Sequence, residues 1–343
     1  MVGTGRVRLV VAMAMACGIA ALHHQAHAQA GNPPANALPN PYRNFEKWGT
    51  FPAGRTMGAS AGLAIDRRGH LWVAERCGGN TCDGRSEAPI LEFDPSGKLE
   101  RSFGAGMFVF PHGIFVDRDQ NVWVSDGDGA NGKGHQVFKF SQDGKLLMTL
   151  WKKGVAGETP DTFNRPCDVA VAADGSIFVA DGHAGDTNAR IVKFSQEGKF
   201  LKTWGKKGSG HGEFVVPHAM AMDSRGRLFV ADRGNNRIQI FDQEGRFLDE
   251  WKQFGQPSDV FIDANDVIFV TDIETTALGP ASGLPRGIRI GSAKNGTVTA
   301  FIPAPEAAPA DPNPAAEGLA EDRMGHLYAA VPALQTLRKY VKK

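Results

Sequence analysis

The chain has 343 residues, of which 42% are hydrophobic, so it can bury the core of one large domain or of two small ones. The 38 Lys and Arg residues nearly balance the 37 Asp and Glu residues, and a net charge of +1 argues against a nucleic-acid or anionic-membrane partner. The 42 Gly and 20 Pro residues indicate many tight turns, which favours an all-β fold.

The first 28 residues have the pattern of a secretory signal peptide. Arg6 and Arg8 form a basic start, residues 9–22 are apolar, and residues 26–28 (AHA) form a small-x-small cleavage site. The apolar stretch is too short to span a membrane. We therefore expect a secreted or periplasmic protein with no membrane span. Its processed chain would carry 36 basic and 37 acidic residues, a net charge of −1.

Residues 29–43 read as an extended Pro-rich linker. Export also bears on the cysteines that follow. Cys77 and Cys82 flank the short loop GGNT, which predicts a disulfide in an oxidising compartment. The alternative, a metal knuckle, needs further Cys or His residues close by, and the segment CGGNTC has none.

From residue 60 onward the chain repeats one unit. Six aligned copies begin at residues 60, 111, 166, 217, 257 and 316, each with a strand, a tight Asp/Gly/Asn turn and an alternating strand. Most copies are followed by two further strands, as in IQIFDQEGRFLDEWK. Such self-similarity predicts a six-bladed β-propeller over residues 44–343.

The sixth copy lacks a fourth strand. The segment NFEKWGTF (residues 44–51) resembles the fourth strands, since its KWG matches the KTWG of blade three. We expect it to pair into the last blade and close the ring, which leaves no free sheet edge. Two insertions interrupt the pattern, one in blade three and one at residues 274–287 in blade five.

The first strand of each blade lines the central channel, so equivalent positions converge on one axis. We call the second residue of each aligned copy the slot residue; the six are Ala61, His112, Cys167, His218, Ser258 and Glu317. Blades two, four and six thus supply two imidazoles and a carboxylate, a set suited to Zn²⁺ or Fe²⁺. Cys167, at the same position in blade three, is a candidate fourth ligand. Alternatively, these residues are polar fillers of a water-filled channel.

A second aligned position follows the acid at the end of each second strand. It places Arg76 in blade one and Arg233 in blade four at one face of the ring, where an Arg fork suits a substrate carboxylate. The alternative is that each arginine forms a surface ion pair with the neighbouring Asp or Glu, which contributes little to the stability of the fold. His183 follows Gly182 at the rim of the same region and is a candidate acid or base.

At this point the residues resemble a known family. The segment from residue 212 to 248 looks like an NHL repeat. The set FPHGIFVDRDQNVWVSD, RPCDVAVAADGSIFVADG and VPHAMAMDSRGRLFVADRGNNRIQIF resembles the propeller of peptidyl-α-hydroxyglycine α-amidating lyase. The resemblance implies three channel histidines on zinc, a tyrosine and two arginines beside it, and a structural calcium deeper in the channel.

Carried over residue by residue, His112 and His218 match the first two zinc histidines, and Glu317 stands where the third should be. His183 occupies the tyrosine position and Arg233 matches one arginine, while Arg55 and Arg76 are both candidates for the other. Gly318 replaces the aspartate that holds calcium in the family, which departs from the pattern of that site.

The resemblance implies a metal-dependent lyase that cleaves the C–N bond of an α-hydroxyglycine-type amide and releases glyoxylate. Its partner would be a small-molecule or peptide substrate with a carboxylate, and we expect a monomer. A non-catalytic exported propeller that binds protein or cell-envelope ligands is the alternative, since repeat folds host both. A lactonase-type hydrolase is disfavoured by the paired histidines.

Overall fold

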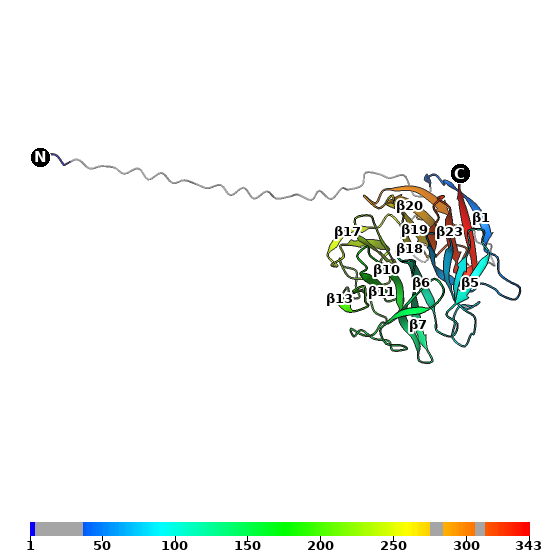
Figure 1. The fold of residues 1–343 in the computed structure, drawn as a ribbon. Helices are drawn as coiled ribbons and strands as arrows, with labels where there is room; N and C mark the ends of the chain where they lie inside the picture. Colours follow the sequence, from blue (N-terminus) through cyan, green and yellow to red (C-terminus); the bar gives the residue numbers. More distant parts are fainter. Residues whose placement is uncertain (4–36, 275–283, 306–312) are drawn as a thin grey trace. The chain divides into compact units, whose positions relative to one another are not determined.

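The computed structural model describes residues 1–3, 37–274, 284–305 and 313–343. The described strands form six four-stranded antiparallel sheets, which are the six predicted blades (Figure 1). The sequence prediction of a six-bladed β-propeller is confirmed. The predicted signal segment lies outside the described residues except for its first three, as does most of the predicted linker.

Each blade has the same strand order, from the channel outward. The innermost strands are β2 (Ser60–Ile65), β6 (Pro111–Val116), β10 (Pro166–Val171), β14 (Pro217–Met222), β18 (Pro257–Ile262) and β22 (Leu319–Glu321). The second strands are β3 (Leu71–Glu75), β7 (Val122–Ala130), β11 (Ile177–Asp181), β15 (Leu228–Asp232), β19 (Val267–Asp272) and β23 (Leu327–Val331).

The outer half of each blade follows the same order. The third strands are β4 (Ile90–Phe93), β8 (Lys133–Phe140), β12 (Arg190–Phe194), β16 (Arg237–Phe241), β20 (Gly287–Ser292) and β24 (Thr336–Lys342). The fourth strands are β5 (Leu99–Phe103), β9 (Leu146–Leu150), β13 (Phe200–Trp204), β17 (Phe247–Trp251), β21 (Val298–Pro303) and β1 (Tyr42–Trp48). Two short 3-10 turns are η2 (Arg233–Asn235) and η5 (Pro332–Leu334).

The ring closes through β1, as the sequence predicts. β1 pairs antiparallel with β24, from Tyr42 opposite Lys342 to Trp48 opposite Leu337. The strand begins at Tyr42, two residues before the predicted start of the propeller at residue 44. In the part of the chain that the structure describes, no helix is long and apolar enough to cross a membrane.

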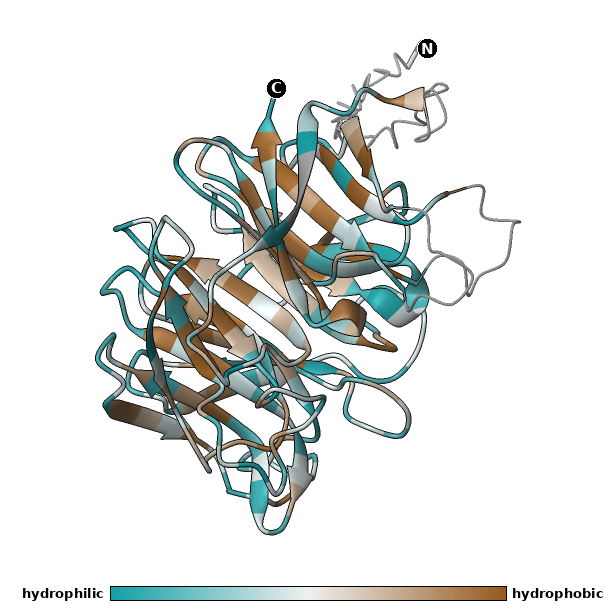
Figure 2. Cartoon of the chain, turned by 90° about the vertical axis from the view of Figure 1, so that its right-hand side faces the viewer, coloured by the Kyte–Doolittle hydropathy of each residue, from teal (hydrophilic) through white to brown (hydrophobic). Residues whose placement is uncertain are grey.

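The core is divided into six hydrophobic clusters, and each fills the space between two neighbouring blades. The cluster between the last and first blades joins Tyr328 and Ala330 to Leu63 and Val73, so this contact is packed like the others. Figure 2 shows the alternation of apolar and polar residues along the strands that supplies these packed faces. Burial between blades fixes each inner strand at a similar depth in the channel.

The slot residues occupy a repeated irregularity of the inner strands. In β10, β14, β18 and β2 the pairing shifts register across the slot residue, and in β6 the shift spans residues 112 and 113. A β-bulge of this kind re-aims a side chain and is common beside functional sites. The same irregularity therefore stands at the slot of these five blades.

A disulfide joins Cys77 and Cys82, with Cα atoms 5.0 Å apart. The predicted bond is confirmed. It closes the loop that follows β3, and both cysteines are buried in the cluster between blades one and two. The bond therefore constrains the backbone that follows Arg76.

In five of the six blades the second strand carries an acid at the same aligned position, and Val331 takes its place in blade six. In blades three, four and five this acid pairs with an arginine of the third strand: Asp181 with Arg190, Asp232 with Arg237, and Asp272 with Arg289, at 2.9–3.1 Å. These pairs cross-link the second and third strands of the blades that surround the channel.

Blade two departs from this pattern, because Gln136 stands opposite Asp126. The Asp126 carboxylate accepts N–H bonds from Val109 and Phe110. Burial raises the pKa of Asp126 to about 7, against the lowering effect of these N–H groups.

Asp126→Asn should change how stability depends on pH. Because the folded-state pKa lies above that of the unfolded chain, the folded protein retains a proton that the unfolded chain loses between pH 4 and 7. The wild type should therefore lose about 2–4 kcal/mol relative to Asp126→Asn as the pH rises through this window. Urea denaturation at several pH values measures this difference; a difference independent of pH would contradict it.

Candidate metal and substrate site

His112 and His218 are held in one tautomer by the neighbouring blades. His112 Nδ1 lies 2.9 Å from the carbonyl oxygen of Cys167, and His218 Nδ1 lies 2.5 Å from that of Ser258. A carbonyl only accepts hydrogen bonds, so Nδ1 must carry the proton and Nε2 the lone pair. Both Nε2 atoms are buried and have no hydrogen-bond partner. This is the arrangement that orients a metal-binding imidazole.

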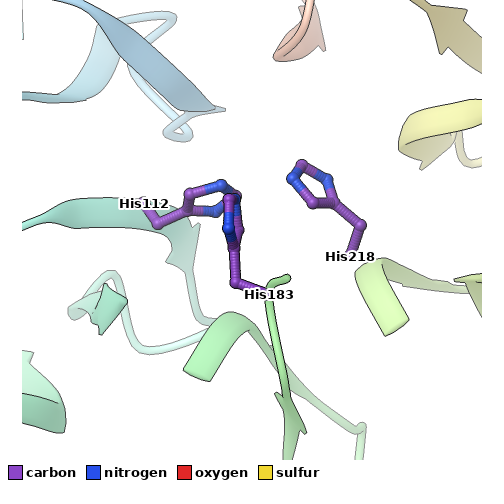
Figure 3. A group of neighbouring side chains, drawn as sticks. All are labelled: His112, His183 and His218. Carbon is purple, nitrogen blue, oxygen red and sulfur yellow. The ribbon is translucent and has the colours of Figure 1, made fainter. Parts of the chain in front are cut away.

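A third imidazole joins them. His183 follows β11, and one ring nitrogen from each of His112, His183 and His218 lies within 4.8 Å of the others (Figure 3). The ring centroids are 4.7–5.2 Å apart, and Nδ1 of His183 is also buried without a partner. His183, predicted as an acid or base at the rim, thus lies against the two slot histidines.

Glu317 meets the same group. Its Oε1 atom lies 4.0 Å from His112 Nε2 and 3.4 Å from His218 Nε2. Two ligands that each lie ~2.1 Å from one zinc ion can be at most ~4.2 Å apart. The two distances meet this limit. Glu317 thus lies near both slot histidines, while the group whose ligand atoms all lie within 4.8 Å of one another consists of the three histidines.

The histidines lie in surroundings that favour neutral rings. The pKa values of His112 and His218 are lowered well below the ordinary value, first by burial and then by nearby positive charge. For His183 burial, followed by Arg233, Arg165 and Arg76, lowers the pKa to about 3. A metal ligand must be neutral imidazole, and the lowered pKa values keep these three rings neutral.

The two predicted arginines lie beside this group because equivalent backbone bonds hold them. The N–H groups of Arg76 and Arg233 donate to the carbonyls of Ala59 and Val216, which precede the slots of their blades. Arg233 Nη1 lies 3.7 Å from Glu317 Oε1. Burial lowers the pKa of Arg76 to about 10, against the effect of Glu317, so Arg76 remains charged at neutral pH.

The contacts favour Arg76 over Arg55 as the second arginine of the candidate site. Arg55 is occupied by Glu75 Oε1 at 2.5 Å and by the carbonyl of Ala88. The Arg76 guanidinium lies 3.7 Å from the ring centroid of Phe110, donates to Asn80, and keeps a buried Nε without a partner. The sequence is compatible with either Arg55 or Arg76, and the contacts that occupy Arg55 favour Arg76.

Cys167 does not point at the metal candidates. Its Sγ atom lies 3.4 Å from the carbonyl oxygen of Gly182, and the thiol is not part of the histidine group among the described residues. Burial raises the pKa of Cys167 well above the ordinary value, which disfavours the thiolate that binds metal. Its main-chain carbonyl, which accepts from His112, is its contribution to the site. The role of Cys167 as a fourth ligand stays a prediction, and these contacts do not support it.

The channel below the histidines runs between the inner strands and encloses about 430 Å³. At Gly318 a Cβ atom would lie 2.2 Å from the carbonyl oxygen of Ala61, so this backbone has no room for the aspartate that the resemblance implies there. The carboxylates at that level are those of Asp168 and Asp259. Each already accepts two backbone N–H bonds.

Sequence reasoning missed three residues of the site. Phe110 stacks under Arg76, and its place before a Pro-His pair was a usable signal. Arg165 contributes to the lowered pKa of His183. Glu274 lies 3.5 Å from Arg233 Nη1. Arg165 stands directly before its aligned copy, as Phe110 does, and Glu274 lies at the start of the blade-five insertion. Neither residue is part of an aligned strand pair.

Fold and site together define a six-bladed propeller with a histidine-rich cluster at its channel. A family model for the NHL repeat matches residues 214–241, in blade four. A gluconolactonase from Xanthomonas campestris has the same fold, with a TM-score of 0.57 and 16% identity over 92% of this chain and 99% of that one. This likeness concerns the fold alone.

Curated relatives carry more specific names. Peptidyl-glycine alpha-amidating monooxygenase of Mus musculus is 36% identical over 204 residues, which cover 52% of this chain and 20% of that protein. Probable peptidyl-alpha-hydroxyglycine alpha-amidating lyase of Caenorhabditis elegans is 34% identical over 206 residues, covering 54% and 56%. The chain is thus a six-bladed propeller in which blade four matches an NHL repeat, and it has homologues named as lyases at moderate identity. It spans a fifth of the mouse relative and about half of the worm relative.

The three propeller cysteines should differ in accessibility. Alkylation of the native protein should leave Cys167 unmodified, because the thiol is buried and protonated. Unfolding without reductant should expose Cys167 alone, and Cys77 and Cys82 should react only after reduction. Peptide mass spectrometry distinguishes these cases. Rapid labelling of native Cys167 would show that its thiol faces the channel as a thiolate.

Proposed function

We propose that this chain is an exported, metal-dependent carbon–nitrogen lyase that acts on an α-hydroxyglycine-type amide. The observation that carries the proposal is the convergence of three buried imidazole nitrogens without partners, two of them with the opposite nitrogen bonded to a carbonyl. The lyase homologues support the reaction class. The predicted signal segment and the disulfide support export.

His112, His218 and Glu317 would hold the metal, which is Zn²⁺ or Fe²⁺. When bound, such an ion polarises the substrate hydroxyl and lowers its pKa. Burial serves this chemistry because an electrostatic interaction strengthens where water is excluded. In this arrangement Glu317 supplies the one negative charge among the three ligands.

The remaining residues divide the work on the substrate. Arg233 binds the substrate carboxylate, with Arg76 beside it on the Phe110 ring. Neutral His183 accepts the hydroxyl proton and delivers it to the amide nitrogen as the C–N bond breaks. The hydroxyl carbon becomes the aldehyde of glyoxylate, and the other product is the free amide. Atoms and charge balance without a further reactant.

The metal assignment predicts distinct outcomes for two histidine variants. His218→Ala should lose most of the bound metal, because a ligand is removed, and should lose turnover with it. His183→Ala should retain the metal and lose turnover by about 10²–10⁴-fold, the usual contribution of a general acid or base. Elemental analysis of purified protein and release of glyoxylate from an N-acyl-α-hydroxyglycine measure the two quantities.

His211→Ala is the matched control, since His211 is exposed and stacks on Phe247 outside the channel. It should keep both metal and activity. A His218→Ala variant with full metal content would overturn the ligand assignment. Loss of metal in His183→Ala would reassign His183 from proton transfer to metal binding. A metal-loaded wild type that releases no glyoxylate would remove the proposed reaction.

A further inference from the structure

The entrance of the site carries a carboxylate that the proposed reaction does not use. Glu274 follows β19, where the insertion of blade five begins, and 40% of its side chain is exposed. The groups below it are almost buried, since Arg233 is 7% and Glu317 is 6% exposed. Glu274 therefore lies on the solvent side of Arg233.

Glu274 contacts the nitrogen that the substrate carboxylate needs. Arg233 Nη1 lies 3.5 Å from Glu274 Oε1 and 3.7 Å from Glu317 Oε1, so one guanidinium nitrogen faces two carboxylates. Charge-assisted N–H···O bonds are usually ~2.7–2.9 Å long, so neither acid satisfies Arg233 fully. A second polar contact of Glu274 runs from Gln256 Nε2 to Oε2 at 3.5 Å, at the limit of a hydrogen bond.

We propose that Glu274 is a specificity-determining residue that competes with the substrate carboxylate for Arg233. The inference rests on the proposed function, in which Arg233 holds that carboxylate. An incoming carboxylate binds by displacing Glu274 toward solvent and forming the shorter bond to Arg233. Glu317 is buried between Arg233 and the histidines and stays in place. Arg233 gives the site its preference for a ligand with a carboxylate over a neutral one of the same shape, and Glu274 lowers that preference.

The proposal predicts that Glu274→Gln changes the affinity for a charged ligand and leaves the affinity for a neutral one unchanged. Glycolate and glycolamide share a hydroxyl and a skeleton but differ in charge. In zinc-loaded protein, Glu274→Gln should tighten glycolate binding about fivefold, which corresponds to ~1 kcal/mol, the upper end for a partly exposed ion pair. The affinity for glycolamide should stay unchanged. Isothermal titration calorimetry measures both dissociation constants without turnover.

Glu100→Gln is the matched control, because the Glu100 side chain has the same 40% exposure but lies on β5, in the outermost strand of blade one. It should leave both affinities at the wild-type value. Arg233→Ala tests the underlying role separately, since it should abolish the preference for glycolate over glycolamide. Arg233→Ala could abolish this preference while Glu274→Gln leaves the glycolate affinity unchanged. In that case Glu274 does not compete for Arg233, and the proposed role of Arg233 stands.

Other results overturn the competition directly. Weaker glycolate binding in Glu274→Gln would mean that Glu274 orders Arg233 for the ligand. Equal tightening of glycolate and glycolamide would mean that Glu274 acts as a steric obstacle. An unchanged glycolate preference in Arg233→Ala would remove the carboxylate role of Arg233 and the competition with it.

Discussion

Two hydrogen bonds between neighbouring blades determine the chemistry of the channel. The Nδ1–H of His112 in blade two donates to the carbonyl of Cys167 in blade three, and that of His218 in blade four donates to Ser258 in blade five. Each bond fixes a tautomer and aims a lone pair at the same space as Glu317. Without them, either ring nitrogen of these buried histidines could carry the proton.

The propeller supplies this geometry because its repeats are bulged at the same place. The slot residue falls out of register with the second strand, which leaves its carbonyl free to accept from a histidine of the preceding blade, as at Cys167 and Ser258. The residue after the slot is a glycine in blades one, two and six, where a neighbouring inner strand comes close. At Gly62, for example, a Cβ atom would lie 2.3 Å from the carbonyl oxygen of His112. The close packing of the inner strands therefore also determines where the slot histidines lie.

The features that could be predicted from the sequence are those that the repeated unit places at equivalent positions. Blade count, the closing strand and the approach of Glu317 to His112 and His218 all follow from equivalent positions at equivalent depth. The direction of the Cys167 side chain could not be read this way, because its thiol faces the Gly182 carbonyl while its own carbonyl faces the site. The approach of His183 to the slot histidines, and of Glu274 to Arg233, depends on segments between or inserted into the repeats. Alignment of copies fixes neither.

X-ray absorption at the zinc edge of the metal-loaded protein tests the central claim most directly, because it reports ligand type and distance together. The account predicts a shell of nitrogen and oxygen atoms at roughly 2.0–2.1 Å, with imidazole scattering from two histidines and no sulfur. A sulfur shell at ~2.3 Å would return Cys167 to the ligand set. A spectrum of hydrated zinc without imidazole scattering would contradict the channel metal site itself.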